Sequence, residues 1–179
     1  MKINAAIIQY DVTKGAGDYN MRRAEELISA AAHEGAELLL LPEMWNSGFD
    51  FEHLPDYAQD FSGEAVTMLR QLARDKSVFI VGGSFAEKKN GKFYNTCPVI
   101  DEQGNVIARY RKVHLFSHYL KEHLYFNSGE EWVITEYQKE NESVKLGHII
   151  CYDLRFPEFI RNLALRGARI FTVPSGWPR

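Results

Sequence analysis

Cys151 follows an apolar, strand-like run and precedes a helical pattern, and a thiol in that position can act as a nucleophile. Pro157 opens the helical pattern, where its fixed φ suits the first turn. The same strand, turn and helix order exposes the nucleophile of hydrolases that carry an elbow motif. Amide N–H groups at a helix start would also lower the thiol pKa. A buried structural cysteine is the alternative, and this segment alone favours neither.

Two other strand-like runs end in a charged side chain. Glu43 follows four leucines and a proline, and Lys112 follows the run 106–111. Ligands of open α/β sheets bind outside the carboxyl ends of the strands, so Glu43, Lys112 and Cys151 could converge in one pocket. Taken singly, Glu43 could be a solvated loop carboxylate and Lys112 one charge of a solvated basic cluster. The sequence around each residue is what makes the set specific.

The sequence around these residues resembles the nitrilase superfamily, the carbon-nitrogen hydrolases with a Glu-Lys-Cys triad. The resemblance implies that Glu43 is the general base, Lys112 the cation on the oxyanion side and Cys151 the nucleophile. A second carboxylate of the family matches Glu122, eight residues before Glu130. The resemblance covers the whole chain and rests on the segments 3–9, 41–43, 94–96 with the turn at Gly104, 110–116 and 151–158.

Amide hydrolysis through a thioester explains why these residue types are needed together. Glu43 would take the proton of Cys151, give it to the departing ammonia and then activate water. Lys112 and the backbone N–H of Tyr152 would face the oxyanion. Because the three side chains of the triad perturb one another, their pKa values would belong to the group.

Within the superfamily, the segments 112–116 and 151–156 look most like the ω-amidase branch, whose members act on 2-oxoglutaramate-type ω-amides. The implied substrate is a small linear amide, and Arg155 could bind its carboxylate with two hydrogen bonds. Arg155 could equally pair with Asp153 or Glu158 of its own chain. An N-carbamoyl amino-acid amidohydrolase and a nitrilase are alternatives within the superfamily, and a non-catalytic binding or assembly protein is the alternative from another class.

The histidines do not form a convincing catalytic or metal site. His148 precedes Cys151 by three residues, so the two side chains point to opposite faces of a strand, and a core role is expected. His114 is expected to pack near the site. His114, His118 and His123 lack the further ligands of a zinc site. We therefore expect no metal and no other cofactor.

Composition fits one catalytic domain over residues 1–179. The chain is 45% hydrophobic, which suffices for one core, and its net charge of -3 gives no footprint for nucleic acid. No apolar run approaches the length that spans a membrane. Cys97 and Cys151 are the only cysteines, and reduced thiols fit a cytoplasmic enzyme. We expect a homodimer or higher homo-oligomer.

The expected fold class is a mixed α/β protein, and the resemblance specifies an α-β-β-α sandwich. Family members continue beyond the segment 175–178 through further strands and a helix, so the sandwich is expected to be truncated at the C-terminus. Missing strands would leave a sheet edge and an apolar face uncovered, which favours aggregation or association.

The order of elements follows from periodicity and from turn residues. Strands and helices alternate first, and hairpins then dominate. The expected elements are a strand at 3–9, a helix at 18–33 capped by Asp18 and ended by Gly35, a strand at 38–41, a loop at 45–61, a helix capped by Ser62, a strand at 78–81, a hairpin turn at 88–91, paired strands at 93–100 and 106–111 and at 132–137 and 144–150, a helix at 157–166 and a strand at 170–173.

Overall fold

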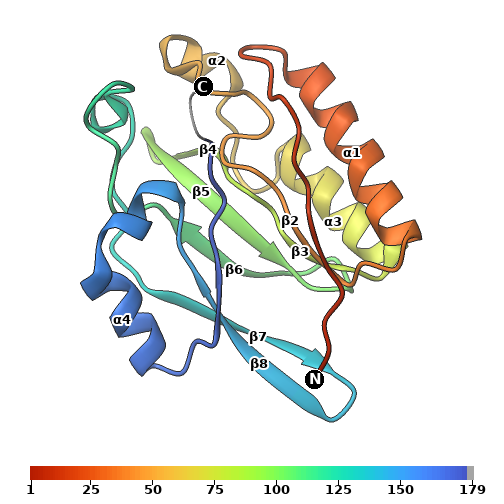
Figure 1. Ribbon diagram of the computed structural model, residues 1–179. Helices are drawn as coiled ribbons and strands as arrows, with labels where there is room; N and C mark the ends of the chain where they lie inside the picture. Colours follow the sequence, from red (N-terminus) through yellow and green to blue (C-terminus); the bar gives the residue numbers. More distant parts are fainter. Residues whose placement is uncertain (177–179) are drawn as a thin grey trace.

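The computed structural model describes residues 1–176 and contains two β-sheets stacked face to face, with helices on the outer sides (Figure 1). This confirms the mixed α/β class and the α-β-β-α sandwich. The first sheet contains β1 (Ala5–Ile7), β2 (Leu38–Leu40), β3 (Phe79–Val81), β4 (Phe85–Lys89), β5 (Lys92–Ile100) and β6 (Val106–Arg111), and the second contains β7 (Val133–Lys139), β8 (Glu142–His148) and β9 (Ile170–Thr172).

Two long helices cover the first sheet and one shorter helix covers the second. Figure 1 shows α1 and α3 side by side, with α4 on the far side of the sandwich. The helices are α1 (Gly17–His33), α2 (Leu54–Tyr57), α3 (Glu64–Lys76) and α4 (Pro157–Leu165), with short 3₁₀ turns at η1 (Phe51–His53), η2 (Glu122–Leu124) and η3 (Cys151–Arg155).

Successive residues of the central strands serve two separate cores, because side chains alternate along a strand. Leu39 of β2 and Ile80 of β3 pack against α1 and α3. Their neighbours Leu38 and Phe79 belong to the core between the sheets. There the Phe79 ring meets the Tyr137 ring of β7 nearly edge-on, with 5.5 Å between centroids.

Strand directions bring several carboxyl ends to the same end of the first sheet. β1, β2 and β3 are parallel, and β5 is antiparallel to β3. β6 is antiparallel to β5 and therefore runs in the direction of β2. β4 and β6 lie on opposite edges of β5, since Thr96 pairs with both Phe85 and Arg111. The residues that follow β2 and β6, Glu43 and Lys112, consequently lie at the same end.

The predicted turns and helix ends are confirmed where a residue adopts positive φ. Asn90 and Gly91 both do so between β4 and β5, with φ of 52° and 74°, as a type I′ hairpin turn requires. Gly35 after α1 and Gly167 after α4 have φ of 88° and 98°. Glycine accepts this conformation without the steric cost that a Cβ brings.

Both predicted helix N-caps are wrong. α1 begins at Gly17 after Ala16, and Asp18 lies inside its first turn, where the carboxylate favours the helix dipole without capping it. α3 begins at Glu64 after Gly63 rather than after a Ser62 cap. The Oε1 atom of Gln59 instead accepts the free N–H of Ala65 at 3.0 Å, so a side chain outside the expected position replaces the cap.

The segment 45–61 is more ordered and more buried than its predicted loop. It contains η1 and α2, and Trp45 is fully buried with its indole N–H donated to the Gly82 carbonyl at 2.9 Å. Phe51 and Leu54 belong to a third apolar cluster, together with Ala86 of β4. Among the helices within residues 1–176, none is long and apolar enough to cross a membrane.

Candidate active site

Lys112 is the centre of a buried polar cluster at the end of the core between the sheets. Its side chain is 2% exposed and its Nζ donates to Glu43 Oε1 at 2.8 Å and to Glu122 Oε2 at 2.7 Å. The structure therefore brings Glu43, 69 residues before Lys112, and Glu122, 10 residues after it, to the same ammonium. One cation faces two carboxylates, so the cluster carries an excess negative charge when both acids are ionised.

Asn95 of β5 ties the two carboxylates together and was not identified from the sequence as a site residue. Its Nδ2 donates to Glu43 Oε1 at 2.9 Å and to Glu122 Oε1 at 2.8 Å. Its backbone carbonyl accepts the N–H of Lys112 at 2.9 Å. The sequence offered one indication: Asn95 lies two residues before Cys97 in a predicted strand, so both side chains are expected on the same face of the sheet, toward the core between the sheets.

Backbone N–H groups also donate to both carboxylates. Glu43 Oε2 accepts the N–H of Gly176 at 3.2 Å, and Glu122 Oε2 accepts the N–H of Phe116 at 2.8 Å. Each acid also adjoins a residue with left-handed φ: Met44 at 51° follows Glu43, and Lys121 at 49° precedes Glu122. Such conformations persist where the surrounding contacts determine them strongly.

Cys151 is the first residue of η3, between β8 and α4, so the strand, turn and helix order is present. The residue itself has φ of 43°, and its N–H donates to the carbonyl of Pro174 at 2.9 Å. The expected lowering of its thiol pKa is wrong. Burial and the nearby Glu43 carboxylate raise the pKa of Cys151 to about 12, against the opposing effect of Lys112.

The charges of the cluster shift one another's titration. Burial alone would lower the pKa of Lys112, but Glu43 and Glu122 together raise it above its ordinary value. Burial raises the pKa of Glu122, and the Glu43 charge adds to this, while Lys112 acts in the opposite direction. The cluster therefore holds a permanent cation beside an acid that ionises less readily than usual.

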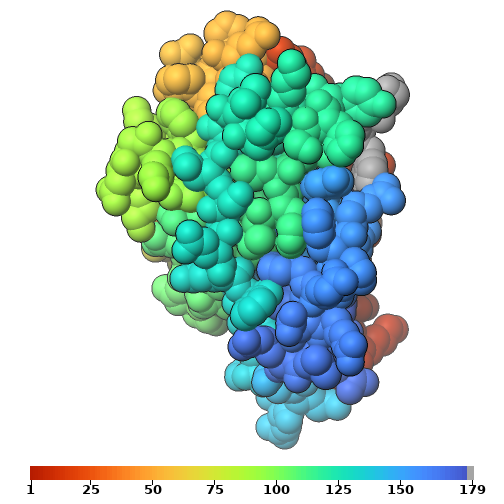
Figure 2. Space-filling view, turned by 90° about the vertical axis from the view of Figure 1, so that its left-hand side faces the viewer, coloured from red at the N-terminus to blue at the C-terminus, as the bar shows by residue number. Residues whose placement is uncertain are grey.

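A cavity of about 520 Å³ opens beside this cluster. Glu43, Lys112, Glu122 and Cys151 all line it, as do the predicted substrate contacts Tyr152 and Arg155. The Phe116 and Tyr152 rings meet edge-on at 5.0 Å. In the view of Figure 2, the green-to-teal segment after β6 accordingly lies against the blue segment that begins at Cys151.

His148 and His114 make structural contacts, whereas His118 lines the cavity beside the Lys112 cluster. His148 is buried, and its two ring nitrogens lie 2.8 Å from the hydroxyls of Thr135 and Thr172, as expected for a core residue. His114 contacts Asp153 and stacks on Phe156 with 3.6 Å between ring centroids. Within residues 1–176, no group of three or more His, Cys, Asp or Glu side chains could hold a metal ion.

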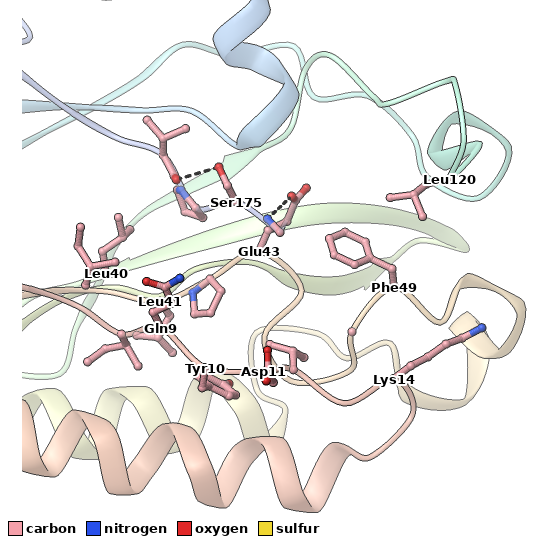
Figure 3. A pocket seen from close by; sticks show the side chains of 18 residues that line it. Gln9, Tyr10, Asp11, Lys14, Leu40, Leu41, Glu43, Phe49, Leu120 and Ser175 are labelled. Atoms are coloured by element: carbon pink, nitrogen blue, oxygen red, sulfur yellow. Dashed lines mark hydrogen bonds between the residues drawn. The ribbon is translucent and has the colours of Figure 1, made fainter. Parts of the chain in front are cut away.

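A second cavity of about 670 Å³ adjoins the first. Figure 3 shows it running from Leu40 and Leu41, past Glu43 and Ser175, toward Phe49, Leu120 and Lys14. Glu43 and Phe49 line both cavities. Ile7 of the edge strand β1 lines the second cavity and is 76% exposed. Apolar side chains from β1 and β2 line the second cavity, whereas Lys112, Glu122 and Cys151 line the first cavity and not the second.

A family model described as carbon-nitrogen hydrolase matches residues 4–178. The chain is 36% identical over 178 residues to a 2-oxoglutaramate amidase of Bacillus subtilis (strain 168) and 33% identical over 182 residues to the omega-amidase NIT2-B of Xenopus laevis. These matches cover 99% and 98% of this chain but 66% and 64% of the relatives. The chain thus spans slightly less than two thirds of their length.

The fold is also similar to that of solved structures. The crystal structure of Saccharomyces cerevisiae Nit3, described as a member of branch 10 of the nitrilase superfamily, matches with a TM-score of 0.86 and 30% sequence identity. The match covers 98% of this chain and 65% of that chain. The two-sheet architecture and the order of elements therefore agree over nearly the full length of this chain.

Proposed function

This chain belongs to the carbon-nitrogen hydrolase family, as its sequence resemblance implied, and we propose that it is a cysteine-dependent amidase. The proposed reaction converts a small linear amide to a carboxylate and ammonia. One observation carries this proposal: Glu43, Lys112, Glu122 and Cys151 come from separate segments and line one cavity. A thiol, a fixed cation and a base in one cavity are the groups that acyl transfer through a thioester requires.

The first half of the proposed reaction is acylation of Cys151. Since its raised pKa keeps the thiol protonated at neutral pH, attack on the amide carbon needs a base. Glu43 takes the thiol proton as the C–S bond forms, and the developing oxyanion faces Lys112 and the backbone N–H of Tyr152. The C–N bond then breaks, Glu43 gives its proton to the leaving nitrogen, and ammonia departs from a thioester on Cys151.

The second half is hydrolysis of that thioester. Glu43 takes a proton from water as the water oxygen attacks the thioester carbon, and Lys112 again faces the oxyanion. The C–S bond breaks, the sulfur of Cys151 regains the proton from Glu43, and the carboxylic acid is released. Glu122 acts through Lys112 in this scheme, because it holds the ammonium, while a further contact, from the Phe116 N–H, anchors the next segment of the cavity lining.

The proposed substrate is an ω-amide that carries a carboxylate. Two facts support this choice: Arg155 lines the cavity with Cys151, and a relative with 36% identity is named a 2-oxoglutaramate amidase. A guanidinium matches a carboxylate with two parallel hydrogen bonds. Arg155 would then set the distance between the carboxylate of the substrate and the amide carbon that meets Cys151.

Ammonia release from a panel of compounds tests this function. The panel contains an ω-amide of a dicarboxylic acid, the uncharged amide of the same length, an N-carbamoyl amino acid and a nitrile. We expect turnover of the anionic ω-amide above the others, and none with Cys151→Ala. If the chain preferred the carbamoyl compound or the nitrile, that compound class would replace ω-amides as the proposed substrate. If it turned over none of the compounds, a binding or assembly role would be favoured.

A further inference from the structure

Asp153 is a fully buried carboxylate, two residues after the nucleophile, for which the proposed reaction has no use. Four donors surround it. Its Oδ2 accepts the Tyr110 hydroxyl at 2.6 Å and the Ile150 N–H at 2.9 Å. Its Oδ1 accepts the His114 N–H at 2.9 Å and contacts the His114 Nδ1 at 2.8 Å. Each oxygen therefore holds one backbone N–H and one side chain.

The two backbone contacts join the segments that carry the proposed nucleophile and cation. Ile150 directly precedes Cys151, and His114 lies two residues after Lys112. Asp153 thus connects the end of β8 to the end of β6 through a single side chain. The Asp153 N–H also donates to the Ile150 carbonyl at 3.0 Å, which closes the turn on itself.

The conformation of Cys151 needs such a connection. Its φ of 43° lies in the left-handed region, which a residue with a Cβ adopts only when its surroundings determine it. Two contacts join the turn to its surroundings: the Cys151 N–H donates to the Pro174 carbonyl, and the Asp153 carboxylate that accepts the Ile150 N–H also accepts the His114 N–H. The His114 ring is itself held, because it stacks on Phe156 at 3.6 Å with 11° between the planes.

We propose that Asp153 is a positioning residue that fixes the sulfur of Cys151 relative to Lys112 and Glu43 during the proposed amidase reaction, on which this inference rests. Only a carboxylate fits its place. Since each oxygen accepts a backbone N–H, an asparagine would have to direct its NH₂ group at one of two backbone donors in either orientation. Asp153→Asn must therefore release either the nucleophile turn or the segment after Lys112.

The test measures alkylation of Cys151 by iodoacetamide, resolved from Cys97 by peptide mass spectrometry and followed from pH 6 to 10. In Asp153→Asn a loosened turn should expose the thiol to water and lower its pKa toward its ordinary value. Alkylation of Cys151 at pH 8 should then accelerate by about tenfold for each unit that its pKa falls. Amide turnover should fall in the opposite direction, by roughly 10²-fold in kcat with little change in KM, because a misplacement of about 1 Å has that effect.

Cys97 is the internal reporter of global unfolding, because it is buried in the core between the sheets. We expect its alkylation to stay as slow as in the parent chain. The matched control is Asp101→Asn, since Asp101 Oδ1 also accepts two backbone N–H groups but in the exposed turn between β5 and β6. This control should leave both thiols and turnover unchanged.

If alkylation accelerated equally at Cys97 and Cys151, Asp153 would support the whole fold rather than the nucleophile turn. If the pH profile of Cys151 alkylation did not change, Asp153 would not determine the position of the Cys151 sulfur. Either result overturns the proposal. If Asp153→Asn does not fold, Tyr110→Phe and His114→Ala replace it, because each removes one side-chain donor that holds the Asp153 carboxylate in place, and a loosened carboxylate should fix the Ile150 and His114 N–H groups less firmly. Unchanged alkylation in both would then overturn it. Alkylation needs no amide turnover, so a parent chain that releases no ammonia refutes the proposed function without deciding this inference.

Discussion

Arg111 and Lys112 are consecutive residues, yet they belong to two different charge clusters on opposite faces of one sheet. Arg111 donates to both oxygens of Glu87, at 2.8 Å from Nε and 2.7 Å from Nη2, and its guanidinium lies 4.0 Å from the centre of the Tyr94 ring. Lys112 instead meets Glu43 and Glu122. Alternation along the strand directs the two cations to opposite sides.

The difference between the two clusters is charge balance. One guanidinium faces one carboxylate in the Arg111 pair, and Thr96 supplies a further hydrogen bond to Glu87 at 2.8 Å. That pair lowers the pKa of Glu87, although burial opposes it. One ammonium faces two carboxylates in the Lys112 cluster, and the pKa of Glu122 is raised. A balanced pair keeps its charges fixed, whereas in the unbalanced cluster one carboxyl group, Glu122, binds a proton more readily than an ordinary carboxyl group does.

Removing the thiol is the strongest test of that distinction. Cys151→Ala should abolish turnover, because no acyl intermediate can form, and should leave the fold intact. Cys97→Ala is the matched control, since Cys97 is buried in the core between the sheets and does not line the cavity, and this substitution should affect stability more than turnover. Mass spectrometry of the parent chain with a slow substrate should find the adduct on Cys151. An adduct on Cys97, or full activity of Cys151→Ala, would contradict the assigned nucleophile.

Neutralising one carboxylate in each cluster should slow acylation in the Lys112 cluster and lower stability in the Arg111 pair. Glu43→Gln keeps the shape of the side chain and removes the base, so the rate of single-turnover acylation should fall by roughly 10²-fold or more. It also balances the Lys112 cluster, and stability should change little. Glu87→Gln should leave acylation nearly unchanged but cost about 1–3 kcal/mol of unfolding free energy, because Arg111 loses its charged partner.

Rapid-quench measurements of acylation and urea unfolding of both variants check these expectations. The comparison fails if Glu87→Gln slows acylation as much as Glu43→Gln does. It also fails if Glu43→Gln acylates at the rate of the parent chain, since the base would then be another group.

Local sequence patterns predicted the strand ends and therefore the positions of Glu43, Lys112 and Cys151. A run of apolar residues that stops at a proline or a polar residue marks the end of a buried strand. Strands that run in the same direction bring the ends before Glu43 and Lys112 together, whereas Cys151 follows β8 of the second sheet, which the sequence pattern did not distinguish from the first. Turns with Asn-Gly or a terminal Gly were also predictable, because few other residues accept positive φ. These features depend on residues close in the sequence.

Features that depend on distant residues were not predictable. Asn95 contacts Glu43 across 52 residues and Asp153 contacts Tyr110 across 43 residues, so no local pattern marks them as partners. The pKa of the Cys151 thiol depends on how deeply the whole fold buries it. The prediction from the nearby helix start, that the pKa is lowered, therefore had the wrong sign. The N-cap of α3 likewise failed because Gln59, outside the helix, supplied the acceptor.

Arg155 offers a smaller test on the side of substrate recognition. If it binds the carboxylate of the substrate, Arg155→Lys should raise KM for an anionic ω-amide by about tenfold or more, since a lysine cannot reproduce two parallel hydrogen bonds. An uncharged amide of the same length should be affected little. Arg161→Lys in α4 is the control, because Arg161 is exposed and does not line the cavity. Equal loss on both substrates would indicate that Arg155 has a structural role.

The pH dependence of stability should have opposite signs in the two clusters. The pKa of Glu87 is lowered in the fold from its ordinary value of 4.5, so its contribution to stability is present above pH 4.5 and is lost as the pH falls through the folded pKa. The pKa of Glu122 is raised, so its contribution is fully present below pH 4.5 and is lost as the pH rises through its folded pKa.

Glu87→Gln and Glu122→Gln remove these two contributions separately, and urea unfolding between pH 3 and 7 measures them. On acidification below pH 4.5, the stability advantage of the parent chain over Glu87→Gln should shrink. On acidification from pH 7 toward pH 4.5, the parent chain should instead gain stability relative to Glu122→Gln, because the buried carboxyl takes up a proton more readily in the folded state than in the unfolded state. If both differences moved in the same direction, the two clusters would share one electrostatic character, and charge balance would not distinguish the structural pair from the site.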